Sequence, residues 1–80
     1  MNITVYGTRQ CPDTCSCLDA LEAAHIPADF KDISQLENLK EFLSIRDNDP
    51  IYDPVKARGG VGIPLLVKDG VRSFEWNDLL

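Results

Sequence analysis

Three cysteines lie close together near the start of this chain, at Cys11, Cys15 and Cys17. Cys11 stands where a strand-like run ends and a helical pattern begins. Free backbone N–H groups and the helix dipole at such a turn favour a thiolate, which is the nucleophilic form of cysteine. Pro12 fits the same turn, because proline is favoured at the first helical position, where its missing N–H costs nothing. Cys11 is therefore the candidate reactive residue, against the alternative of a cysteine that merely occupies a loop.

The other two cysteines differ in how they face Cys11. Within a helix, Cys15 returns to the same face as Cys11 with a Cα separation of about 6 Å, which is within the range for a disulfide. Cys15 either resolves a disulfide formed on Cys11 or is an exposed neighbour without a role. Cys17 lies about 240° around the helix from Cys11, so it is poorly placed to pair with it. Because a free cysteine behaves as a small apolar side chain, we expect Cys17 to be a core residue.

A metal site is another chemistry that clustered cysteines can carry. The spacing Cys-x3-Cys-x-Cys lacks a fourth ligand and does not match the common zinc motifs. His25, the single histidine, lies at the end of the helical pattern, where as a cation it would interact favourably with the helix dipole. We therefore expect no metal ligands in this chain.

The composition indicates one small folded domain over residues 1–80. Apolar residues make up 44% and charged residues 26%, as in ordinary soluble proteins. The net charge of −5 argues against nucleic acid and anionic membranes as partners. The sequence has neither a membrane-spanning apolar run nor a signal-peptide pattern, so we expect a cytosolic protein. In that reducing compartment, clustered cysteines are more often catalytic, redox-sensing or metal-binding than structural.

The hydrophobic periodicity predicts an α/β domain with the element order βαβαββ. The predicted strands cover residues 2–6, 28–33, 63–67 and 71–74, and the predicted helices cover residues 13–25 and 36–45. Residues 46–60 are polar and include two prolines and two glycines, so we expect a loop with one helical turn around residues 55–57. Asp69-Gly70 predicts a hairpin turn, and residues 76–80 predict a final turn, at most a stub of a last helix.

The second predicted helix carries a start signal and an apolar stripe. Ser34 and Glu37 form a capping-box pattern, in which the serine oxygen caps free N–H groups and the glutamate reaches back. The residues predicted to form its buried face are Leu36, Leu39, Phe42 and Leu43. Tyr52 and Trp76 are expected to be packing residues, and Tyr52 alternatively borders a substrate groove.

The most apolar run of the chain begins with a proline, Pro64, directly after Ile63. Proline donates no hydrogen bond to a sheet, so it belongs at an edge, a first residue or a bulge. The glycine-rich residues 59–62 ahead of it supply unusual backbone freedom. This combination suits a special turn, with either a trans or a cis Ile63–Pro64 bond.

These features together resemble the glutaredoxin-like proteins of the thioredoxin-fold superfamily, over residues 2–75. The resemblance rests on the strand at residues 3–6, on Cys11-Pro12, on the element order and on Ile63-Pro64 before the hairpin. It implies a four-stranded mixed sheet flanked by helices, here with a truncated C-terminal helix. It also implies that Cys11 is the nucleophile, that Pro64 is a cis-proline and that the Ile63 backbone pairs with bound glutathione or peptide.

The chain departs from the family pattern at several site positions. The resolving position of the family's Cys-Pro-x-Cys motif is Thr14, and Cys15 follows one residue later. Thr8 replaces the family's lysine, with Arg9 beside it as a substitute. Residues 74–78 replace the signature that binds the glutathione carboxylate, which argues against glutathione as the partner, and Asp13 would also repel that anion.

The resemblance implies a thiol–disulfide oxidoreductase that reduces protein or low-molecular-weight disulfides. Cys11 and Cys15 would be catalytic, and Pro12, Arg9 and the Ile63-Pro64 pair would bind the substrate. We expect a monomer with no tightly bound cofactor. The alternative is a non-catalytic redox-sensing or metal- or iron–sulfur-binding module that presents residues 46–60 to a partner, and a third is a scaffold domain with inert cysteines.

Overall fold

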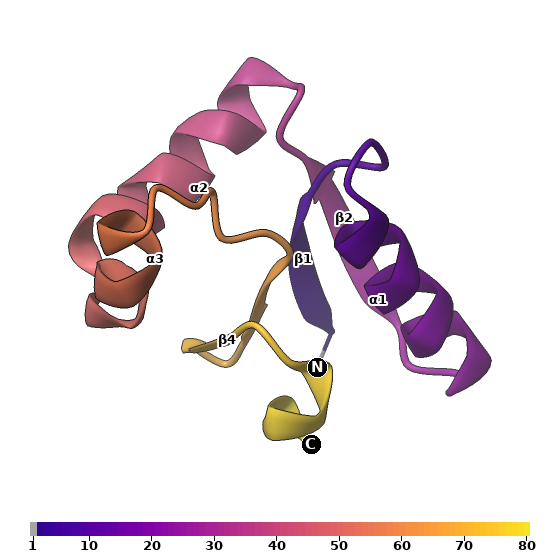
Figure 1. The fold of residues 1–80 in the computed structure, drawn as a ribbon. Helices are drawn as coiled ribbons and strands as arrows, with labels where there is room; N and C mark the ends of the chain where they lie inside the picture. The colour runs from indigo at the N-terminus through magenta and orange to yellow at the C-terminus, as the bar shows by residue number, and fades with distance from the viewer. Residues whose placement is uncertain (1) are drawn as a thin grey trace.

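Two of the predicted strands lie side by side at the centre of the sheet in the computed structural model, which describes residues 2–80 (Figure 1). β1 (Ile3–Gly7) pairs in parallel with β2 (Ala28–Asp32) and antiparallel with β3 (Leu65–Lys68). β4 (Val71–Ser73) pairs antiparallel with β3, which gives the order β2-β1-β3-β4. The predicted α/β class with a four-stranded mixed sheet is therefore confirmed.

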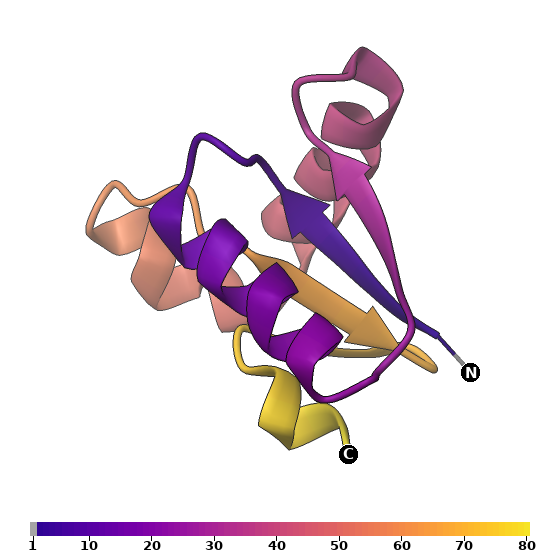
Figure 2. The same cartoon turned by 90° about the vertical axis from the view of Figure 1, so that its right-hand side faces the viewer.

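The helices lie on both faces of this sheet (Figures 1 and 2). The first, α1 (Pro12–Ala23), lies on one face, and α2 (Leu36–Asn48) and α3 (Asp53–Ala57) lie on the other. Two short 3-10 helices complete the chain, η1 (Pro50–Tyr52) and η2 (Trp76–Leu79), and η2 is the predicted C-terminal stub. Within residues 2–80, no helix is both long and apolar enough to cross a membrane.

The alternation of side chains along the central strands divides the core into two clusters. Val5 and Leu66 pair across the sheet and face α1, whereas their neighbours Tyr6 and Leu65 also pair and face α2. The cluster under α1 consists of Ile3, Val5, Leu21, Leu66 and Leu79. The cluster under α2 and α3 consists of Tyr6, Phe42, Tyr52, Val55 and Leu65. Each face of the sheet is thus covered by its own helices.

The hairpin and the proline turn have the predicted character. Asp69 and Gly70 both have positive φ angles, 52° and 81°, as the tight turn between β3 and β4 requires. The Ile63–Pro64 bond is cis. β3 begins at Leu65 rather than at the predicted residue 63, because Pro64 has no N–H to donate to the sheet.

The prediction for the start and buried face of α2 was wrong in part. Ser34 does not cap the helix: its N–H donates to the Asp32 carboxylate at 2.9 Å, and the helix begins at Leu36 with Gln35 as its N-cap. Leu36 is 65% exposed and Leu43 39% exposed. The reason is that the helix turns Phe42 into the core, with Leu39 and Ile45 beside it, so Leu36 and Leu43 lie off the buried stripe.

Residues 46–60 are more ordered than the predicted loop. α2 continues to Asn48 instead of ending at residue 45, and η1 and α3 follow with only one residue between α2 and η1. The predicted turn at residues 55–57 is confirmed as the end of α3. Asp49 caps η1 by accepting from the Ile51 N–H at 3.0 Å, and its other carboxylate oxygen pairs with Arg72 on β4 at 3.1 Å. These contacts tie the segment to the sheet.

Candidate active site

Cys11 is the N-cap residue of α1, and Pro12 is its first helical residue. The Cys11 side chain is partly exposed, and it makes no capping hydrogen bond. Within residues 2–80, the backbone N–H groups of Asp13 and Thr14 also have no hydrogen-bond partner. Unpaired N–H groups at a helix start stabilise a negative charge placed before them. This arrangement can stabilise a thiolate at Cys11.

Thr14, in the first turn of α1, is fully buried. Its hydroxyl oxygen has no hydrogen-bond partner among the described residues. A Cβ added at Gly7 would lie 2.6 Å from that oxygen, so only glycine allows the first turn of α1 to lie this close to the end of β1. The burial of Thr14 was not predicted from the sequence, in which Gly7 at the end of β1 is its one signal.

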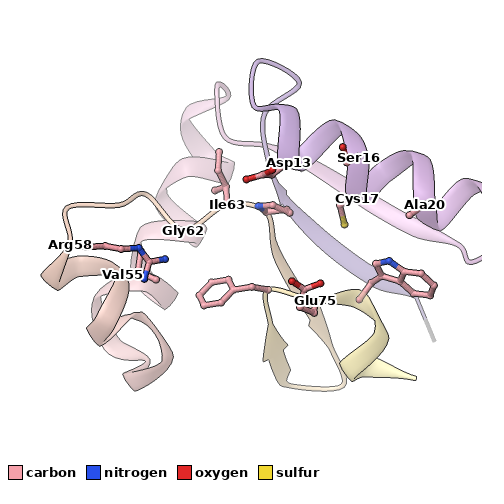
Figure 3. A pocket seen from close by; sticks show the side chains of 12 residues that line it. Asp13, Ser16, Cys17, Ala20, Val55, Arg58, Gly62, Ile63 and Glu75 are labelled. Carbon is pink, nitrogen blue, oxygen red and sulfur yellow. The ribbon is translucent and has the colours of Figure 1, made fainter.

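The three thiols are free and lie in three different surroundings. Cys15 is turned back toward the loop before the helix, where its Sγ donates to the Arg9 carbonyl at 3.1 Å. Cys17 packs partly against the apolar cluster under α1, as predicted, but its sulfur also faces a groove (Figure 3). Burial, and then the nearby Glu75 carboxylate, raise the pKa of the Cys17 thiol. Cys17 is therefore a poor nucleophile at neutral pH.

The groove has a volume of about 470 Å³ and lies between α1 and α3 (Figure 3). The α1 wall begins at Asp13, two residues after Cys11, and continues through residues one and two turns further along the same helix face. The residues that line the groove are Asp13, Ser16, Cys17, Ala20, Val55, Arg58, Gly62, Ile63, Pro64, Phe74, Glu75 and Trp76. Cys11 and Pro12 are not among these lining residues, although Asp13 follows Cys11 by only two residues.

Residues 60–64 form the floor of the groove, which residues 62–64 line directly. Two side chains fix this segment through hydrogen bonds to its carbonyl groups. Arg46 donates to the Gly60 carbonyl at 2.6 Å and to the Val61 carbonyl at 3.1 Å. The Tyr52 hydroxyl donates to the Gly62 carbonyl at 2.7 Å. The next peptide groups, those of Ile63, make no hydrogen bond within residues 2–80. An unpaired stretch of backbone therefore borders the groove beside Pro64.

Tyr52 is fully buried, as its predicted packing role requires. Its ring makes edge-to-face contacts with Phe42 on α2 and Phe74 after β4, at centroid distances of 6.0 and 5.1 Å. Burial raises the pKa of its hydroxyl, so the group remains a hydrogen-bond donor at all physiological pH values. The hydrogen bond to Gly62 had no signal in the sequence.

We expect Tyr52→Phe to lower the free energy of unfolding by about 1–2 kcal/mol, because it leaves the Gly62 carbonyl without its buried donor. Urea unfolding followed by circular dichroism measures the change.

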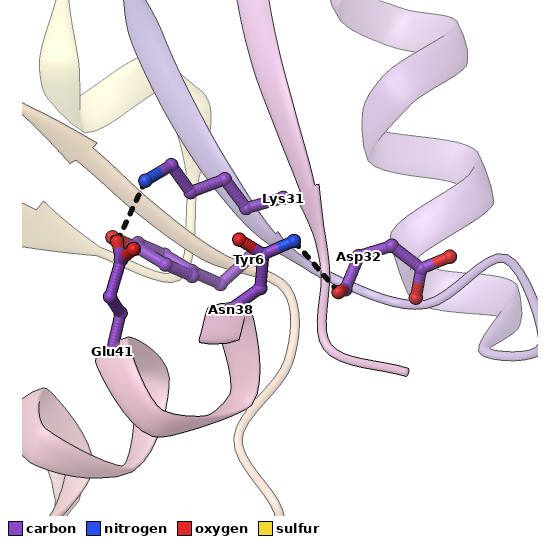
Figure 4. A network of polar contacts seen from close by, with 5 residues as sticks. All are labelled: Tyr6, Lys31, Asp32, Asn38 and Glu41. Atoms are coloured by element: carbon purple, nitrogen blue, oxygen red, sulfur yellow. Dashed lines mark hydrogen bonds and ion pairs between the residues drawn. The ribbon is translucent and has the colours of Figure 1, made fainter. Parts of the chain in front are cut away.

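Tyr6→Phe is the matched control, because the Tyr6 hydroxyl lies in a half-exposed network (Figure 4). There Glu41 accepts from the Tyr6 hydroxyl at 3.0 Å and from Lys31 at 2.7 Å, while Asn38 donates to the Asp32 carbonyl at 3.0 Å. Lys31 keeps Glu41 paired when the hydroxyl is lost, so we expect a loss of about 0.5 kcal/mol. Equal losses in the two variants would contradict the assigned role of Tyr52.

The predicted site residues are only partly brought together. Ile63 and Pro64 line the groove, whereas Cys11 and Pro12 are not among its lining residues and stand just before Asp13 at the start of α1. Arg9 lies on the other side of α1, where its guanidinium carbon is 5.5 Å from the centre of the Phe30 ring. Cys15 is not among the lining residues either. Within residues 2–80, no group of three or more His, Cys, Asp or Glu residues is arranged to hold a metal ion.

Comparison with known proteins gives one informative match. Over 64 residues the chain is 38% identical to an uncharacterized protein of Haemophilus influenzae, and the alignment covers 79% of this chain and 74% of that protein. No family model and no solved structure matches the chain.

Proposed function

The chain belongs to the same family as the uncharacterized Haemophilus influenzae protein, and we propose that it is a glutaredoxin-like thiol–disulfide oxidoreductase with a thioredoxin fold. The fold assignment is supported by the mixed sheet of order β2-β1-β3-β4 with helices on both faces. The observation that carries the function is the position of Cys11. It is a partly exposed thiol at the N-cap of α1, two residues before Asp13, which lines a groove with unpaired backbone along its floor.

In the proposed reaction, the Cys11 thiolate attacks one sulfur of a substrate disulfide. A new S–S bond forms between Cys11 and that sulfur, and the second substrate sulfur leaves as a thiolate that takes a proton from water. The N–H groups of Asp13 and Thr14 stabilise the attacking thiolate. The peptide groups of Ile63 pair with the backbone or amide groups of the substrate and align its disulfide.

A second thiol then attacks the Cys11 sulfur and releases the bound half of the substrate. Either Cys15 or a small thiol from solution performs this step. Cys15 must first give up its hydrogen bond to the Arg9 carbonyl. Both routes take two electrons in total from thiols and need no tightly bound cofactor. The activity suits a monomer in a reducing cytosol, with protein or small-molecule disulfides as its substrates.

Trapping the intermediate tests which thiol reacts. The reduced protein is mixed with a limiting amount of 2-hydroxyethyl disulfide and quenched in acid, and the adduct is then located by peptide mass spectrometry. We expect the hydroxyethylthio group on Cys11 at early times, followed by a Cys11–Cys15 disulfide if Cys15 resolves it. A first adduct on Cys15 or Cys17, or equal labelling of all three cysteines, would contradict the proposed nucleophile.

A further inference from the structure

The groove whose α1 wall begins two residues after Cys11 carries negative charge on two opposite sides. Asp13 lies on the α1 wall, and Glu75 lies across the groove, in the segment after β4 (Figure 3). Neither carboxylate makes a hydrogen bond or an ion pair with any of residues 2–80. Arg58, the one cationic lining residue, lies on the far side beside α3. These two sides of the groove are therefore acidic, and neither carboxylate has a counterion among residues 2–80.

Two aromatic side chains also line the groove. Phe74 and Trp76 flank Glu75 in the sequence, and both line the groove. An indole face attracts cations through its ring quadrupole, and this attraction adds to that of a carboxylate. Burial, and after it the Glu75 carboxylate, raise the pKa of the Cys17 thiol, so the charge of Glu75 acts on a side chain that lines the groove. Carboxylates and an indole together form a surface suited to an ammonium group.

We propose that this groove selects small disulfides that carry an ammonium group beside the reacting sulfur, such as those of aminothiols. This inference rests on the proposed function. The ammonium lies between Asp13 and Glu75 while Cys11 attacks the neighbouring sulfur. The reaction is the exchange described above, with the aminothiol leaving as the released thiol. A disulfide with carboxylates at the same distance from its sulfur meets repulsion from both side chains.

Three disulfides of similar size provide the test: cystamine, which is a dication, 2-hydroxyethyl disulfide, which is neutral, and 3,3′-dithiodipropionate, which is a dianion. The rate of the first exchange is measured with the reduced protein and excess disulfide. Each rate is divided by the rate of the same disulfide with 2-mercaptoethanol, which removes differences in intrinsic reactivity. The cation-to-anion ratio of these normalised rates is the readout.

We expect this ratio to be roughly tenfold or more at low ionic strength, because two nearby carboxylates act with opposite sign on the two substrates. The ratio should fall severalfold at about 1 M salt, where charges are screened within about 3 Å. The double variant Asp13→Asn/Glu75→Gln should bring the ratio close to one.

The matched control is Asp19→Asn/Glu22→Gln, which makes the same charge change on the other side of α1. We expect it to leave the ratio unchanged. A ratio near one in the native protein, or a ratio that the groove variant does not alter, would overturn the inference. If the neutral disulfide formed no adduct with Cys11, the proposed function itself would fail, and that outcome is separate from a loss of charge preference.

Discussion

Changing Cys11 to serine is expected to reduce disulfide exchange by roughly a thousandfold or more. A serine hydroxyl is not ionised at neutral pH, so it cannot replace the thiolate that attacks the disulfide. Serine is also a preferred N-cap residue, whose oxygen can accept from the unpaired N–H groups of the first turn of α1. The variant should therefore be at least as stable as the native protein. The activity is measured as reduction of 2-hydroxyethyl disulfide with a small thiol as the reductant.

The other cysteines give the comparison that assigns the role. Cys17→Ala is expected to retain most of the activity, because the raised pKa of that thiol leaves it little ionised at neutral pH. Cys15→Ser should accumulate the mixed disulfide on Cys11 if Cys15 is the resolving thiol, and should behave like the native protein if a small thiol resolves it. If Cys11→Ser kept its activity while Cys17→Ala lost it, the nucleophile would have to be reassigned to Cys17.

Changing Gly62 to alanine is expected to destabilise the domain by about 2–4 kcal/mol, and Gly59 provides a matched control. Gly62 has a φ of +82°, and an added Cβ would lie only 2.2 Å from the Tyr52 ring. Gly59 has a similar φ of +74°, but no atom lies within 4 Å of the position of its Cβ. Both variants carry the cost of a left-handed backbone, about 1 kcal/mol. Only Gly62→Ala adds overpacking, typically about 1–3 kcal/mol.

Urea unfolding of the two alanine variants separates the cost of the left-handed backbone from the cost of overpacking. A domain of this size has a free energy of unfolding of roughly 4–12 kcal/mol, so Gly62→Ala should shift the midpoint strongly and Gly59→Ala only slightly. Because Gly62 belongs to the floor of the groove, the larger loss should be accompanied by slower exchange at Cys11. Equal destabilisation in the two variants would show that the backbone angle alone decides the cost, and that Tyr52 does not hold the floor in place.

Much of this architecture follows from signals that lie within a few residues of one another. The strands, the helix after Cys11-Pro12 and the Asp69-Gly70 hairpin were predicted correctly, because periodicity, proline at the first helical position and glycine in a tight turn act through local backbone conformation. For the same reason the sequence by itself placed Cys11 at the start of α1. The errors in α2 concerned its start, its end at Asn48 and its buried face. At the start, the Asp32 carboxylate accepts from the Ser34 N–H, the group that Glu37 would bind in a capping box.

What only the tertiary structure decided is which distant side chains meet. The packing of α1 against the sheet determines on which side of the helix Arg9 lies and whether Cys17 faces the groove. The same packing places Asp13 opposite Glu75. The hydrogen bonds that Arg46 and Tyr52 donate to the floor join residues 10 to 15 positions apart, across the segment that the sequence indicated as a loop. Such contacts are set by burial and by the geometry of the whole fold. No short sequence pattern predicts these hydrogen bonds, because the residues next to each donor and acceptor do not differ from those of other helices and loops.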